Sequence, residues 1–421
     1  MSLLSLLKLN ITGLFFLVMT TLLLIDILTL LGFSYNYKIK NKYAKIICIS
    51  LFCLFSLIIY YFIIWAFYIH EWTRVNENII HMYQLSGIVV ITYVPKVIYL
   101  LFYFIQLLVS LFKFLLKIFF KKNINLLSKN NAFLNVGIFI SLFSFLFLIY
   151  GTVAGRFHYE ITHQKLVCKS LPELFNNFKI VQISDIHIST YYNHEKELNK
   201  LIKLVNDQNP DVIFFTGDLI NNFSEEVKPF IPILEKLSAK YGKFAIFGNH
   251  DYGDYYRWKN DSLREENHKI LINSVKSAGF KLLLNENTVI RNQADSIIIA
   301  GTENWGPLPY RQAGDLTKTL KGTNANNFIL LLSHDPSVWD KFVKSHPNII
   351  VTFSGHTHGM QIGINCCNFY WTPFHMRYKR WIGLYKENDQ YLYVNRGIGA
   401  GLYSGRIGMW PEISVFELKK K

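Results

Sequence analysis

Acidic residues are scarce in the first 155 positions of this 421-residue chain. That stretch contains only Asp26, Glu71 and Glu77 against 12 lysines and arginines, whereas the remainder has 26 acidic and 32 basic residues. The formal charge of +15 therefore lies mostly around apolar segments. It forms no basic stripe of the kind that nucleic-acid-binding domains carry, so we expect no nucleic-acid partner. The change in composition near residue 155 predicts at least two domains.

Cysteine is also rare, and its five positions support no cysteine-based site. No CxxC motif occurs, so neither a structural zinc site nor a redox pair is indicated. Cys48 and Cys53 fall in an apolar run, where small thiols are ordinary. Cys366 and Cys367 are adjacent, which is too close for relaxed disulfide geometry. The cysteines therefore do not indicate whether the protein lies in an oxidising or a reducing cellular compartment.

Long apolar runs, by contrast, are abundant before residue 155. Four of them reach the length of about 20 residues that a membrane-spanning helix needs. They are Ile11–Phe33, Ala44–Ile69, Gly87–Phe112 and Phe133–Val153. A cleaved signal peptide is a poor alternative for the first, because it is too long and three more follow. We predict a multi-pass α-helical membrane region over residues 1–155.

Polar residues interrupt two of these runs. We expect Pro95 to kink the third span and the neighbouring Lys96 to extend toward an interface. Asp26 lies inside the first span, where an acid is a functional candidate by default. A single Asp near a helix end more often pairs with another side chain or with water. A role in transport would rest only on Asp26 and the four spans.

The charges of the loops predict the orientation. The first loop carries Lys38, Lys40, Lys42 and Lys45, and the third carries Lys113, Lys117, Lys121, Lys122 and Lys129. The second loop has only Arg74 against two acids. The positive-inside rule then places the first and third loops in the cytoplasm. We expect the part after residue 155 to face the outer side of a bacterial inner or cell membrane.

From about residue 178 the pattern changes to short apolar runs that alternate with helical spacing. The predicted strands are Lys179–Ile183, Val212–Thr216, Lys243–Phe247, Ser296–Ala300, Phe328–Leu332, Ile349–Phe353, Tyr391–Val394 and Ile413–Leu418. The predicted helices are Glu195–Val205, Glu225–Ala239 and Asp261–Ala278, the last stopping before Gly279. This alternation predicts an α/β sandwich with largely parallel sheets over residues 178–419. Residues 156–177 are expected to be a linker.

Five short polar motifs each begin where a predicted strand ends. They are Ser184-Asp185-Ile186-His187, Thr216-Gly217-Asp218, Gly248-Asn249-His250-Asp251, Ser333-His334-Asp335 and Gly355-His356-Thr357-His358-Gly359. Each is weak evidence alone, since Gly-Asp after a strand is usually a turn. Together they bring Asp, Asn and His, ligands that suit Mn, Fe or Zn, to the carboxyl edge of the sheets. We expect their glycines to let the backbone turn sharply there.

In this order the motifs resemble the two-metal site of calcineurin-like metallophosphoesterases, over roughly Phe178–Leu418. On that pattern the first divalent ion would be held by Asp185, His187 and His358, the second by Asn249, His334 and His356, and Asp218 would bridge both. A bridging carboxylate fits, since each oxygen can serve one of two cations about 3.5–4 Å apart. The histidine ligands must be neutral, so we expect activity to fail in acid.

The resemblance also implies the catalytic chemistry. His250 would contact the phosphoryl group and protonate the leaving oxygen, and Asp251 beside it would orient it. A metal-bridging hydroxide would attack phosphorus in line, with no covalent phospho-enzyme. Asp335 and Asp251 are the candidates for hydrogen-bond partners behind the histidines.

Within this family the chain looks most like the bacterial membrane-associated branch. The shared features are the N-terminal spans, the junction Gly155-Arg156-Phe157 and the segment Asn395-Arg396-Gly397-Ile398-Gly399. The resemblance implies a membrane-anchored hydrolase of phosphate mono- or diesters, lipid-linked esters included. The segments Trp305–Arg311 and Trp371–Trp381 would contact a lipid or headgroup, or equally be ordinary loop anchors.

Two alternatives stay open. Some relatives cleave the pyrophosphate of UDP-diacylglucosamine in lipid A synthesis, but that intermediate is made on the cytoplasmic side, against the predicted orientation. The other alternative is a non-catalytic membrane sensor that binds a phosphorylated ligand. A lost metal ligand or a missing catalytic histidine would favour the sensor, and neither is seen.

Overall fold

The computed structural model describes residues 11–37, 39–70, 76–120, 132–256, 258–366, 369–372, 376, 378–401 and 403–421. The chain divides into two compact units, Met1–Val153 and Ala154–Lys421. Several residues used above lie outside the described residues, namely Lys38, Glu71, Arg74, Lys121, Lys122, Lys129 and Cys367.

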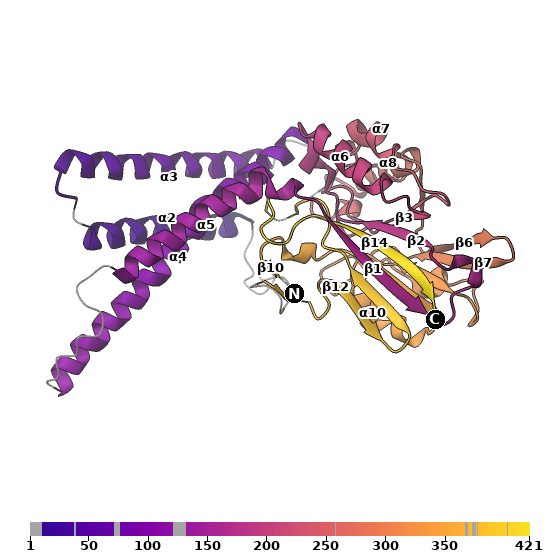
Figure 1. Ribbon diagram of the computed structural model, residues 1–421. Helices are drawn as coiled ribbons and strands as arrows, with labels where there is room; N and C mark the ends of the chain where they lie inside the picture. The colour runs from indigo at the N-terminus through magenta and orange to yellow at the C-terminus, as the bar shows by residue number, and fades with distance from the viewer. Residues whose placement is uncertain are drawn as a thin grey trace. The chain divides into compact units, whose positions relative to one another are not determined.

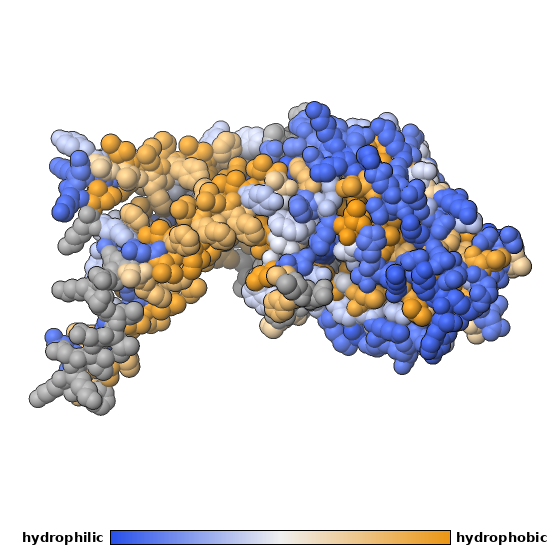
Figure 2. Space-filling view, in the orientation of Figure 1, coloured by the Kyte–Doolittle hydropathy of each residue, from blue (hydrophilic) through white to orange (hydrophobic). Residues whose placement is uncertain are grey.

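The first unit consists of long helices in its described part: α2 (Ile11–Asn36), α3 (Lys42–His70), α4 (Asn76–Phe120) and α5 (Ala132–Val153). Each is long and apolar enough to cross a membrane, as predicted. Figure 2 shows the surface of these helices as mostly hydrophobic. Helices that are apolar on all sides are typical of membrane spans. Pro95 lies within α4 and does not end it.

Asp26 of α2 is buried in this unit and is held by side chains from two other helices, α3 and α4. Lys96 Nζ lies 2.6 Å from Asp26 Oδ1, and the Tyr93 hydroxyl donates to Asp26 Oδ2 at 3.0 Å. The Tyr60 hydroxyl donates to the same oxygen. Lys96 also lies over the rings of Phe52 and Tyr93. Lys96 therefore does not extend to an interface as expected. It neutralises Asp26, because a charge among apolar helices is costly unless it is paired.

Removing one partner of this ion pair should destabilise the helices more than removing both. Lys96→Met leaves the Asp26 carboxylate buried without a counter-charge, which costs about 3–5 kcal/mol. Asp26→Asn combined with Lys96→Met removes both charges and should recover most of that loss. Thermal unfolding of the full-length protein in detergent, followed by circular dichroism, measures both effects.

Lys117→Met, at an exposed position of α4, is the matched control and should leave the unfolding temperature unchanged. A double variant as unstable as Lys96→Met would show that the pair contributes nothing specific to the bundle.

Two six-stranded sheets form the second unit. The first sheet has the order β1 (Glu160–Cys168), β14 (Glu412–Lys420), β2 (Lys179–Ile183), β3 (Val212–Phe215), β4 (Lys243–Ala245) and β5 (Phe280–Leu282). The second has the order β12 (Gly383–Glu387), β13 (Gln390–Val394), β9 (Ile349–Ser354), β8 (Ile329–Leu332), β7 (Asp295–Gly301) and β6 (Glu286–Asn292). Neighbouring strands are parallel except β14–β2, β12–β13 and β6–β7. The predicted α/β fold with largely parallel sheets is confirmed.

The sheets pack face to face, and helices cover their outer sides. Phe353 of β9 contacts Phe214 of β3 and Phe416 of β14, with ring centroids 5.0 Å apart in both pairs. The outer face of the first sheet packs against α6 (Glu195–Asn206) and α8 (Asp261–Ser277); Figure 1 shows α6, α7 (Ile231–Leu234) and α8 gathered on one side of the strands. On the outer face of the second sheet lies α10 (Ser337–Lys341). Burial on both faces explains the continuous apolar runs.

Residues 225–239, predicted as one helix, are broken into three pieces. They form the 3-10 turns η4 (Ser224–Glu226) and η5 (Lys228–Phe230) and the four-residue α7. Pro229 and Pro232 lack a backbone N–H and fit only the first turn of a helix, so each begins a new piece instead of continuing one.

The stretch expected to be a linker contains β1, which pairs with β14 in parallel along its whole length. Its side chains are mostly half-exposed, as at the edge of a sheet, so it lacks the apolar run that marked the other strands. Other short elements include the strands β10 (Ile364–Cys366) and β11 (Phe369–Trp371) and the helix α9 (Leu316–Thr319).

Candidate metal centre

The five motifs converge at the carboxyl ends of β2, β3, β4, β8 and β9. Ligand atoms of Asp185, His187, Asp218 and His358 all lie within 4.8 Å of one another, and so do those of Asp218, His334 and His356. His187 Nε2 lies 3.1 Å from His358 Nε2, and His334 Nε2 lies 3.2 Å from Asp218 Oδ2. Asp218 thus belongs to two adjacent groups of metal-ligating atoms.

Asn249 lines the same cavity as Asp218, His356 and His358. Its Nδ2 donates to the hydroxyl of Tyr255 at 2.7 Å, which fixes the orientation of the amide. Its Oδ1 is buried and accepts no hydrogen bond from the described residues. A buried oxygen without a donor is costly in a folded protein, and a bound cation would satisfy it. The residues present therefore fit a metal ion at this position.

The backbone is strained at the predicted ligands. Positive φ angles occur at Asp185 (51°), His187 (41°), Asp218 (57°), His356 (72°) and His358 (54°). L-residues rarely adopt this region, and each such conformation costs on the order of 1–3 kcal/mol. Strain of this kind persists where a functional arrangement requires it.

Two of the motif glycines are needed for space and not for a turn. A Cβ on Gly248 would lie 2.2 Å from Asp218 Oδ1, and a Cβ on Gly355 would lie 2.2 Å from Asp185 Oδ2. Of the four motif glycines, Gly217 and Gly359 have a positive φ, at 97° and 55°. The ligand carboxylates are thus packed directly against glycine backbone.

A second partner fixes the ring of each histidine. His187 Nδ1 lies 2.9 Å from Asn221 Oδ1, and His334 Nδ1 lies 2.7 Å from the carbonyl oxygen of Thr216. In both residues Nε2 therefore faces the group of ligand atoms. Such outer partners select the tautomer and hold the metal-facing nitrogen in place.

His356 and His358 are held in the same way. His356 Nε2 lies 2.8 Å from the Tyr378 hydroxyl and 3.4 Å from Asp335 Oδ2, the outer partner expected from the sequence. His358 Nδ1 lies 3.3 Å from Nη2 of the buried Arg406. Asn221 and Arg406 lie in no motif that the sequence singles out, whereas Tyr378 lies in the aromatic segment Trp371–Trp381.

Asp251 contacts backbone amides and not His250. Its carboxylate accepts from the N–H groups of Asp218 (2.8 Å), Leu219 (2.9 Å), Ile220 (3.2 Å) and Gly248 (2.9 Å). His250 Nδ1 instead lies 3.0 Å from the carbonyl oxygen of Asn221. The expectation that Asp251 orients His250 is wrong, because Asp251 ties together the loops that follow β3 and β4.

Burial and charge set the protonation of the histidines. Burial lowers the pKa of His187 to about 3 and that of His356 to about 4, so both rings are neutral, as metal ligands must be. Burial acts the same way on His334, but the charges of Asp218 and Asp185 outweigh it and raise its pKa to about 10.

A cavity of about 380 Å³ opens over these ligands and is lined by aromatic side chains. The ring of Tyr255 lies 4.4 Å from that of His250, and the Tyr310 ring meets that of His356 at 4.9 Å. Tyr310 and Tyr378 come from the two aromatic segments singled out in the sequence. In the part of the chain that the structure describes, no lysine or arginine lines this cavity.

Two sheets that bring paired carboxylate and imidazole groups to one cavity define a metallohydrolase. Residues 178–360 match the sequence profile of the calcineurin-like phosphoesterase family. The chain is 34% identical over 267 residues to the uncharacterized metallophosphoesterase YkuE of Bacillus subtilis, covering 62% of this chain and 85% of that protein. This chain belongs to the calcineurin-like metallophosphoesterase family, as its motifs predict. It is a metal-dependent hydrolase that uses two divalent ions.

Two further relatives are similar to this chain over more than half of its length. A transmembrane protein with metallophosphoesterase domain from Danio rerio is 27% identical over 277 residues, covering 65% of this chain and 60% of that protein. The UDP-2,3-diacylglucosamine pyrophosphatase LpxG of Chlamydia trachomatis is 27% identical over 280 residues, covering 55% of this chain and 81% of that protein.

Proposed function

We propose that the protein is a membrane-anchored phosphoesterase that hydrolyses phosphate mono- or diesters, lipid-linked esters included. Asp185, His187 and His358 would hold one divalent ion, Asn249, His334 and His356 the other, and Asp218 would serve both. The observation that carries this assignment is the position of Asp218 in both groups of ligand atoms. The donor set suits Mn, Fe or Zn.

The chain's own residues account for proton transfer and positioning. Two divalent cations bound here would supply Lewis-acid activation of the phosphoryl oxygens and of water. His250 lines the cavity, and its Nδ1 is held by a backbone carbonyl, which leaves Nε2 to donate a proton to the leaving oxygen. Its backbone N–H donates to Asp218 Oδ1 at 2.9 Å, so the acid is positioned directly from the shared ligand.

The cavity favours an ester with one phosphoryl group beside an apolar or aromatic moiety. Its tyrosines offer stacking surfaces for that moiety, and its described lining contains no lysine or arginine for a second phosphate. The competing candidate is pyrophosphate cleavage of UDP-diacylglucosamine, which the similarity to LpxG supports.

Turnover by the full-length protein in detergent decides between enzyme and sensor. With Mn²⁺ we expect hydrolysis of bis-p-nitrophenyl phosphate or p-nitrophenyl phosphate, and loss of that activity with a chelator. Binding of phosphate without hydrolysis of either ester, in a preparation that holds two ions, would support the non-catalytic sensor instead.

Reporter fusions after Gly155 test the orientation. Lysines concentrate in the first and third loops, and these loops are short enough for the positive-inside bias to act. Alkaline phosphatase fused there should be active and green fluorescent protein dark. Fusions after Asn41, in the first loop, should give the opposite result and serve as the control. If alkaline phosphatase fused after Gly155 is inactive and green fluorescent protein fluoresces, the catalytic part faces the cytoplasm. Pyrophosphate cleavage of UDP-diacylglucosamine then becomes the first candidate.

A further inference from the structure

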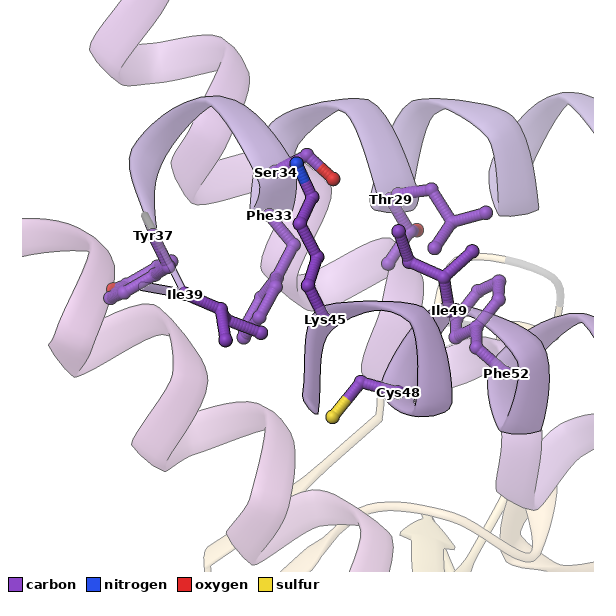
Figure 3. A pocket seen from close by; sticks show the side chains of 10 residues that line it. Thr29, Phe33, Ser34, Tyr37, Ile39, Lys45, Cys48, Ile49 and Phe52 are labelled. Carbon is purple, nitrogen blue, oxygen red and sulfur yellow. The ribbon is translucent and has the colours of Figure 1, made fainter. Parts of the chain in front are cut away.

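A second cavity, of about 200 Å³, lies in the membrane unit between α2 and α3. It is much larger than the roughly 30 Å³ that one water molecule occupies. Figure 3 shows its lining, which comes from the end of α2, the following turn and the start of α3: Thr29, Leu30, Phe33, Ser34, Tyr37, Ile39, Lys45, Cys48, Ile49 and Phe52.

The lining is divided between an apolar and a polar part. Leu30, Phe33, Ile49 and Phe52 offer only hydrocarbon and aromatic surface. Lys45, an exposed residue in the first turn of α3, extends its amine toward Ser34 in Figure 3. An apolar interior with a cation and a hydroxyl at one end matches the form of an amphiphile.

The charge around the cavity selects the kind of amphiphile. Between Asp26 and Glu71 the sequence has four lysines and no acidic residue. No ion pair involves Lys45 among the residues that the structure describes. A lysine that borders apolar helices attracts anionic lipid headgroups, with about 1 kcal/mol for each such charge.

We propose that this cavity binds an anionic phospholipid. The lipid phosphate contacts Lys45 and Ser34, and part of one acyl chain lies against Phe33, Ile49 and Phe52. A soluble anion would leave the apolar lining unfilled, and a zwitterionic lipid would bring its own cation to the lysine-rich loop. This site is separate from the metal centre and does not depend on the proposed hydrolysis.

The cysteines of α3 provide the test. Both Cys48 and Cys53 are exposed on this helix, and Cys48 lines the cavity whereas Cys53 does not. Full-length protein in detergent is alkylated with a maleimide in the presence of phosphatidylglycerol or phosphatidylcholine, and both sites are followed by peptide mass spectrometry. Phosphatidylglycerol should slow the alkylation of Cys48 and not that of Cys53. Phosphatidylcholine should slow the alkylation of Cys48 far less.

Two variants separate the headgroup from the chain. Lys45→Gln should weaken protection by phosphatidylglycerol about fivefold, the equivalent of one lysine–headgroup contact. Lys42→Gln, which removes a charge outside the lining, should change it less. Ile49→Trp, checked for retained helicity by circular dichroism, fills the cavity and should abolish protection by either lipid. Equal protection by the two lipids, or protection that Lys45→Gln leaves unchanged, would overturn the proposal.

Discussion

Asp218→Asn should lower both bound metal and turnover, with a loss of at least about 10²-fold in hydrolysis of bis-p-nitrophenyl phosphate. Mutation of a residue that only supports a metal ligand lowers metal affinity or activity by roughly 10–100-fold. Asp218 should matter more, because it contributes atoms to both groups of ligands. The amide keeps the shape of the side chain but lacks the charge and the second oxygen that two cations would share. Metal analysis of the purified full-length protein, alongside the rate, measures both effects.

Asp207→Asn is the matched control, because Asp207 is exposed just after α6 and forms an ion pair with Lys203. It should leave metal content and rate unchanged. Two ions retained in Asp218→Asn at full rate would remove Asp218 from the centre. An active preparation of the unaltered protein that holds a single ion would overturn the two-metal assignment.

His250→Ala should retain both ions yet slow the hydrolysis of alkyl phosphate esters by about 10²–10⁴-fold, the usual contribution of a general acid. Aryl esters such as p-nitrophenyl phosphate hardly need a proton donor and should lose much less. The expected result is therefore a difference between two substrate types at constant metal content. The steady-state rates on both types, with metal analysis of the same preparation, measure it.

His163→Ala, an exposed histidine on β1, controls for the loss of an imidazole elsewhere. It should change neither rate. Equal losses on alkyl and aryl esters in His250→Ala would argue that His250 positions the substrate and transfers no proton. Loss of metal from that variant would place His250 among the ligands.

Much of the candidate site could be predicted from the sequence because its parts are local. Each ligand motif directly follows a strand, and a strand that is buried on both faces is recognisable as an apolar run. Parallel strands bring their carboxyl ends to one edge, so the order of motifs along the chain implies their meeting in space. The four apolar spans are equally local, since a stretch of about 20 apolar residues suffices to cross a bilayer.

The strand at Glu160–Cys168 and the broken helix at 225–239 show the limit of local patterns. An edge strand with half-exposed side chains lacks the pattern of apolar residues that would distinguish it from a linker. Its pairing with β14 makes it a strand. In the other segment the apolar spacing favoured a helix, but two prolines remove the N–H groups that a continuous helix needs.

The hydrogen-bond and ion-pair partners of the buried polar side chains depend on the tertiary structure. Asp251 is adjacent to His250 in sequence yet binds the amides of the loop after β3, more than thirty residues away. Asp26 is paired across the helices with Lys96, and His358 with Arg406. The places of the ligand residues at strand ends could be read from local patterns in the chain. Their partners depend on how distant elements pack, because a buried charge or hydrogen-bonding group must be satisfied by whatever the fold brings within about 3 Å.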